Sequence, residues 1–129
     1  MSCQRPARIL FWIATAAVLV LTLMPAQFLP EKGPFNFWDK AQHALAFAVL
    51  TLLSLLGWRQ RAARWRLVLG LLTLGGAIEV AQHFTGWRHG EWADWAADAV
   101  GVVVVAIAAL FPTRALLPPR RNTRQPPGP

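Results

Sequence analysis

The feature that most constrains this chain is a run of 22 residues, 9–30, without a single charged side chain. A helix needs about 20 mostly apolar residues to cross the hydrocarbon core of a bilayer. Three further apolar runs follow, which are shorter or contain a titratable residue, and together the runs predict an all-α, polytopic membrane protein. We expect four transmembrane helices in an antiparallel bundle, at about residues 9–28, 40–58, 66–84 and 95–112.

A soluble four-helix bundle is the alternative, and the second run argues against it. The outer face of a soluble helix carries polar residues at helical period. Between residues 44 and 56 only Thr51 and Ser54 are polar. Charged residues make up 15% of the chain, whereas soluble domains carry roughly 25%. The first run could also be a signal peptide, but no small-x-small cleavage site follows it, so we expect it to be retained.

The basic residues are distributed unevenly between the connections. Ten of the 13 Lys and Arg residues lie before the first run, between the second and third, or in the tail, and no acid lies among them. The positive-inside rule then places both termini in the cytoplasm. Because topology explains the net charge of +7, we expect no nucleic-acid partner. The predicted organisation is a basic cytoplasmic N-terminus, a transmembrane domain and a disordered Pro/Arg-rich cytoplasmic tail, at residues 1–8, 9–112 and 113–129.

Polar residues gather where three predicted helices meet the extracytoplasmic edge. Residues three or four apart share a helix face, and each of these helices carries such a polar stripe. In lipid, the stripes must turn toward one another or toward a water-filled cleft. The candidate functional cluster is therefore Asp39, Lys40, His43, Glu79, Gln82, Arg88, Asp94 and Asp98.

Several of these residues also fit ordinary structural roles. Asp39 and Gln42 form a capping-box pattern, and acids at 94 and 98 complement a helix N-terminus. Lys40 is expected to contact lipid headgroups. Small residues permit close helix packing in membranes, and this role is expected for four glycines: Gly70, Gly75, Gly76 and Gly101.

Glu79 is harder to explain structurally. It lies near the C-terminal end of its helix, where the helix dipole disfavours a negative charge, and it interrupts an apolar run. We expect it to be paired, and Arg88, across the turn at Gly86, is the candidate partner.

The motifs at these positions resemble the VanZ-like family of small bacterial integral membrane proteins. The matching residues are Asp39, Lys40, Ala41, Gln42 and His43 with Phe47, then Glu79, Val80, Ala81 and Gln82, then Gly86, Trp87 and Arg88, and finally Asp94 and Gly101. Asp98 departs from the pattern, because the family often has Asn there, and Val105 stands where a second glycine is common.

The resemblance implies a multi-pass protein of the bacterial plasma membrane and cell envelope. It also implies a link to resistance against teicoplanin-type glycopeptides, although a shared fold does not fix a function. The leading hypothesis is binding or modification of a polar lipid or lipid-linked cell-wall precursor headgroup, with Arg88, Lys40 and two helix N-termini holding a phosphate. The partners expected are membrane lipids.

Two alternatives to headgroup binding stay open. The protein can be a non-enzymatic structural or partner-binding protein whose polar cluster joins the helices, or it can be a proton-linked carrier. Enzymatic activity is undecided, and no Ser or Cys lies in the cluster for covalent catalysis. No cofactor is expected. A metal site is conceivable but ranks below a hydrogen-bonded network, and its ligands would be Asp39, His43, Glu79 and His83.

Overall fold

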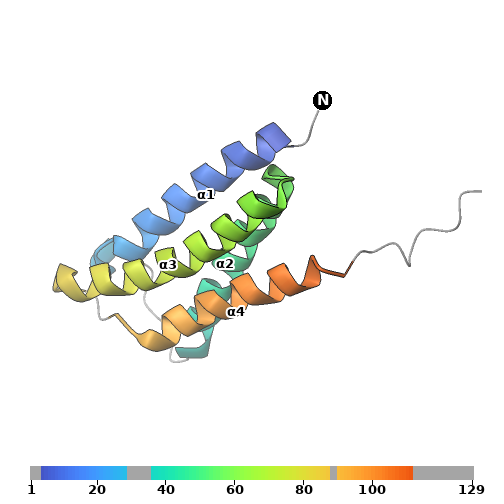
Figure 1. The fold of residues 1–129 in the computed structure, drawn as a ribbon. Coiled ribbons are helices and arrows are strands. Elements are labelled where there is room, and N and C mark those ends of the chain that lie inside the picture. Colours follow the sequence, from blue (N-terminus) through green and yellow to red (C-terminus); the bar gives the residue numbers. More distant parts are fainter. Residues whose placement is uncertain (1–3, 29–35, 88–89, 112–129) are drawn as a thin grey trace, which may run out of the picture.

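The structure is a computed structural model that describes residues 4–28, 36–87 and 90–111. Within these residues it is all-helical and contains no strand, which confirms the all-α part of the prediction. The four spans and their antiparallel arrangement stay predictions. The elements are α1 (Gln4–Leu23), the 3-10 helix η1 (Ala26–Phe28), α2 (Asn36–Gly57), α3 (Arg61–Thr85) and α4 (Trp92–Ala108) (Figure 1). The predicted tail at 113–129 lies outside the described residues.

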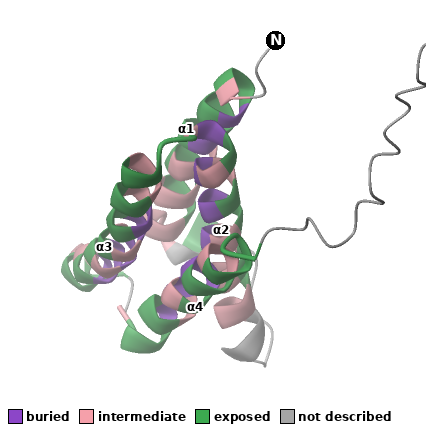
Figure 2. Ribbon diagram, turned by 45° about the vertical axis from the view of Figure 1, so that its right-hand side comes forward, coloured by how far each residue is buried: buried purple, intermediate pink, exposed green. Residues whose placement is uncertain are grey.

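Three helices are long and apolar enough to cross a membrane: α1, α2 from Asp39 onward, and α3. The fourth, α4, has 17 residues. Large apolar side chains are exposed on all four helices, including Ile13, Leu45, Leu69 and Val104 (Figure 2). Such outward-facing apolar surface is expected where helices contact lipid rather than water.

All four helices begin earlier than the sequence predicted, with α2 starting at Asn36 rather than residue 40 and α4 at Trp92 rather than residue 95. α1 starts at Gln4 rather than residue 9, and α3 starts at Arg61 rather than residue 66. The predicted bounds were taken from the uncharged runs. Absence of charge determines which residues can enter lipid, but charged residues can still be part of a helix. α1 also ends at Leu23 rather than near residue 28. Pro25 accounts for this end, because the residue before a proline is disfavoured in the helical region.

The helices pack around one apolar core. α1, α2 and α3 contact one another, and α4 contacts α2 and α3. The buried apolar side chains come from all four helices: Phe11, Phe47, Leu50, Val68, Leu71, Ile78 and Val102. The packing brings the beginnings of α2 and α4 beside the end of α3.

Glycine allows the closest helix approach. A Cβ on Gly101 of α4 would collide with the backbone carbonyl of Ala44 in α2, so only glycine fits at this contact. A Cβ on Gly75 would lie 3.0 Å from Oδ2 of Asp98. Gly76 has only ordinary contact distances to Trp95, and the packing prediction is wrong for Gly70, where an added Cβ meets nothing within 4 Å.

Arginines close the C-terminal end of α2. Nε of Arg8 donates to the carbonyl of Gly57 at 2.8 Å, and the same guanidinium lies 5.2 Å from the Trp58 ring centroid. Arg64 donates from Nε to the carbonyl of Trp58 at 2.8 Å and from Nη2 to that of Leu55 at 3.1 Å. These donors satisfy carbonyls that have no partner within the helix and place positive charge at the negative end of its dipole.

Candidate functional site

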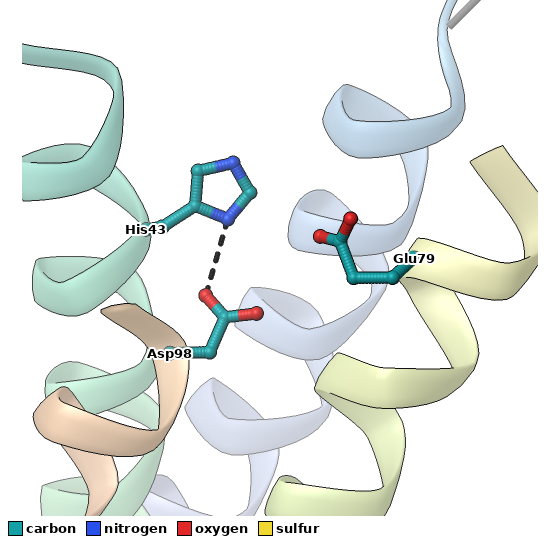
Figure 3. Close-up of side chains that lie close together, drawn as sticks. All are labelled: His43, Glu79 and Asp98. Atoms are coloured by element: carbon teal, nitrogen blue, oxygen red, sulfur yellow. Dashed lines mark hydrogen bonds and ion pairs between the residues drawn. The ribbon is translucent and has the colours of Figure 1, made fainter. Parts of the chain in front are cut away.

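Three helices contribute titratable side chains to one point at the opposite end of α2. His43 lies in the second turn of α2, Glu79 near the end of α3, and Asp98 in the second turn of α4 (Figure 3). One ligand-capable atom from each of them lies within 4.8 Å of the other two. We call the end of the bundle formed by these residues with Lys40, Glu91 and Asp94 the polar end.

His43 and Asp98 form the central contact of the polar end. Nδ1 of His43 lies 3.1 Å from Oδ1 of Asp98, which is 1% exposed. The other ring nitrogen, Nε2, lies 3.9 Å from Oδ2 of Asp94. The imidazole is therefore placed between two carboxylates of α4, so the contact ties α2 to α4.

Glu79 is buried without a hydrogen-bond partner. The residue is 4% exposed, and neither carboxylate oxygen has a partner with full hydrogen-bond geometry among the described residues, although the backbone N–H of Glu91 lies near the carboxylate. The same holds for Oδ2 of Asp98. Burying an acceptor without a donor costs about 1–3 kcal/mol, and more for a charged group. Three such oxygens, on two buried side chains at one end of the bundle, are unusual for a folded protein.

Lys40 is bound within the chain, and the expected role in headgroup contact is not what the structure shows. Its Nζ lies 3.0 Å from Oδ1 of Asp94 and 3.1 Å from Oε2 of Glu91. The acids hold the ammonium group between α2 and the start of α4. Lys40 therefore neutralises these two carboxylates rather than Glu79 or Asp98.

Two other candidates are placed differently from the prediction. Asp39 lies in the first turn of α2, because this helix begins at Asn36, so it is not the residue that caps the helix. Gln82 is buried, but its Nε2 donates to the carbonyl of Thr22 at 2.9 Å. Its amide thus joins α3 to α1 instead of entering the cluster.

Arg88 lies outside the described residues, so its predicted pairing with Glu79 stays a prediction. His83, a member of the metal set considered from the sequence, is exposed. Asp98 joins His43 and Glu79 in the set that the structure brings together, and Asp39 and His83 do not belong to it.

Glu91 is the residue that the sequence analysis omitted from the cluster. It binds a lysine 51 positions earlier in the chain, and no local spacing reveals such a partner. The available signal was its position three residues before Asp94, which puts both acids on one side of the helix start.

The arrangement suits two kinds of chemistry. A histidine between carboxylates can transfer protons, and imidazole with carboxylate oxygens can bind a cation. No family model, curated protein or solved structure matches this chain. The geometry of the polar end and the motif resemblance are therefore the indications of function.

Proposed function

We propose that the chain is a four-span, VanZ-like integral membrane protein of the bacterial cell envelope. Its antiparallel helices present the polar end at the extracytoplasmic edge of the plasma membrane, where it binds the polar headgroup of a lipid or lipid-linked cell-wall precursor. The observation that carries headgroup binding is the set of unpartnered oxygens on Glu79 and Asp98. Buried acceptors require donors, and hydroxyl, amide and ammonium groups of a headgroup supply them.

The phosphate of such a headgroup needs a different partner. Lys40 is engaged by Glu91 and Asp94, so the phosphate role falls to Arg88, which the motif resemblance also selects. Four spans require α4 to cross as well. Its 17 residues match the lower end of the range for transmembrane helices, about 17–25, and it carries no charge after Asp98.

Cysteine labelling in intact cells tests the topology. In a Cys3→Ser background, Gly33→Cys should react with an impermeant thiol reagent, and Ala62→Cys should react only after the cells are opened. Gly33 is the better outer reporter than Gly90, because a side chain at Gly90 would collide with the carbonyl of Glu79. Labelling of the position 62 cysteine in intact cells would contradict cytoplasmic termini.

Lipid analysis of the purified protein tests headgroup binding. We expect a specific polar lipid to co-purify with the wild type and to be depleted at least tenfold in Glu79→Gln and in Arg88→Ala. Arg59→Ala is the matched control, because Arg59 is exposed at the far end of the bundle and its loss should leave the lipid unchanged. Identical lipid profiles in all four proteins would exclude a specific headgroup site. Teicoplanin susceptibility of cells with and without the protein tests the resistance link.

A purely structural role is the second candidate, and the contacts of α2 with α4 favour it. Lys40 with Asp94 and His43 with Asp98 join these two helices directly. If this is the whole function, changes at Asp94 will lower stability while the lipid profile stays that of the wild type.

A further inference from the structure

We propose that His43, Glu79 and Asp98 bind one divalent transition-metal ion at the polar end. The three residues come from α2, α3 and α4, so the ion would connect three helices at a point where described side chains leave acceptors unsatisfied. The ion and a headgroup would use the same unpartnered oxygens of Glu79 and Asp98, so the zinc content and the lipid profile of the wild type distinguish the two proposals.

The spacing of the three side chains is close to that of a metal site. Their ligand-capable atoms lie within 4.8 Å of one another. Bonds of about 2.0–2.2 Å to a tetrahedral ion put ligand atoms about 3.4 Å apart. Nδ1 of His43 and Oδ1 of Asp98 are 3.1 Å apart in a hydrogen bond, so an ion held by both atoms would replace that bond, and the side chains would turn toward the ion. Figure 3 shows the carboxylate of Glu79 turned toward the other two side chains.

The unpartnered oxygens are an independent indication of a ligand. Both oxygens of Glu79 and Oδ2 of Asp98 are buried and lack a hydrogen-bond partner in the described part of the chain. Natural proteins leave few buried polar groups in this condition, and a bound ion is one recognised way in which such groups are satisfied. One ligand-capable atom from each of Glu79, Asp98 and His43 lies within 4.8 Å of the other two, so one ion can contact all three residues.

The charge of the site fits a divalent ion. Two carboxylates carry two negative charges, and Lys40 is bound to Glu91 and Asp94 instead. Buried charges are paired or coordinate metals, because unpaired ions lose their hydration without compensation. One divalent ion held by Glu79, Asp98 and a neutral imidazole makes a site without net charge.

Asp94 and Lys40 supply the surroundings that a metal-binding histidine requires. A ligating histidine commonly directs its second ring nitrogen at a carboxylate, which fixes the orientation of the ring. With Nδ1 as the ligand, Nε2 of His43 faces Oδ2 of Asp94 at 3.9 Å. Lys40 holds this carboxylate through its other oxygen at 3.0 Å.

The ligand types select the class of metal. Imidazole with carboxylates suits zinc and other first-row transition metals, whereas calcium and magnesium prefer oxygen ligands alone. Three protein ligands leave at least one coordination position for water or another ligand, as in catalytic zinc sites and unlike closed structural ones.

Zinc binding to the purified, tag-free protein tests the proposal. After removal of metal with a chelator, we expect one zinc per chain by elemental analysis after dialysis, unaffected by excess magnesium. Cobalt should give the visible absorption of a four-coordinate site. Glu79→Gln and Asp98→Asn preserve size but replace good ligands with amides, so each should weaken zinc binding at least tenfold.

Two controls separate this site from incidental binding. His83→Ala removes an exposed histidine, and Glu91→Gln removes a half-exposed acid that contacts Lys40, so both should bind zinc like the wild type. Circular dichroism establishes whether each variant keeps its helices. Absence of zinc from the wild type, or unchanged binding in folded Glu79→Gln and Asp98→Asn, would overturn the proposal. A wild-type protein that binds no zinc but still co-purifies with its specific lipid would reject the metal site and leave the headgroup proposal standing.

Discussion

The two ends of α2 differ in whether their polar groups have hydrogen-bond partners. At its C-terminal end, the carbonyls of Leu55, Gly57 and Trp58 accept hydrogen bonds from Arg8 and Arg64. We call this the capped end. At the polar end, carboxylates are buried in excess of their donors, and three oxygens have no partner among the residues that the structure describes.

The difference shows that this fold can bury polar groups and still satisfy their hydrogen bonds. Between the two ends, Thr51 and Ser54 are completely buried, yet each donates to a carbonyl of its own helix. A chain that satisfies its polar groups at one end and along the interior can do so at the other. Unsatisfied acceptors confined to the polar end therefore indicate a binding site rather than poor packing, and stability measurements can test this contrast.

The largest effect is expected where α4 is held against α2. Gly101→Leu should prevent the close approach to Ala44 and lower the free energy of unfolding by about 3 kcal/mol or more. Gly70→Leu is the control, because Gly70 is exposed and a side chain there meets nothing within 4 Å. Unfolding by SDS, followed by circular dichroism, compares the two variants. Equal stabilities would show that α2 and α4 do not pack as described.

The capped end should respond next most strongly. Arg64→Ala leaves the carbonyls of Trp58 and Leu55 without their charged donor and should lower the free energy of unfolding by about 2 kcal/mol. Arg59→Ala, at an exposed neighbouring position, should change it by no more than about 0.5 kcal/mol. Zinc binding should be unaffected by either change, and a loss of zinc in Arg64→Ala would show that the two ends are coupled.

At the polar end, removing a buried charge should raise stability. Glu79→Met keeps a similar length and removes two unpartnered oxygens, so the metal-free protein should gain about 1–2 kcal/mol in the same SDS unfolding assay. With zinc present, the order should reverse, because only the wild type gains free energy from binding the ion. A less stable Glu79→Met protein without metal would mean that Glu79 has a partner within the chain, with Arg88 the first to examine by a double-mutant cycle.

The apolar runs were enough to predict the four helices, and local spacing predicted the members of the polar end apart from Glu91. His43, Glu79 and Asp98 were selected because each shares a helix face with another polar residue. The same rule failed for His83. Successive residues of a helix are about 100° apart, so a helix that buries Gln82 turns His83 outward even though both are close to the face of Glu79.

The partners of the charged residues could not be predicted from spacing. Lys40 binds acids 51 and 54 positions later, and Arg8 binds a carbonyl 49 positions away. These contacts depend on how the helices pack, which the apolar runs do not specify. The positive-inside pattern explained why arginines cluster between the second and third helices, but it did not indicate that Arg8 and Arg64 close the end of α2.

The smallest effect is expected at Lys40, which binds two acids of unequal exposure. The side chain of Asp94 is 12% exposed and that of Glu91 is 50% exposed, although both lie about equally close to Nζ of Lys40. Water and salt screen an exposed ion pair, which contributes about 0–1 kcal/mol at most. Asp94→Asn should therefore lower the free energy of unfolding by about 1 kcal/mol, and Glu91→Gln by less than half as much.

The salt dependence of stability distinguishes the two ion pairs of Lys40, because they have similar lengths but differ in burial. Raising the ionic strength should remove the effect of Glu91→Gln and leave most of that of Asp94→Asn, because buried pairs are screened less. Asp94→Asn should also weaken zinc binding modestly, since Asp94 faces the second ring nitrogen of His43. Equal losses of stability with equal salt dependence would mean that Asp94 is as accessible to water as Glu91. The polar end would then be open to solvent. Water would satisfy the unpartnered oxygens of Glu79 and Asp98, and these oxygens would no longer indicate a ligand site.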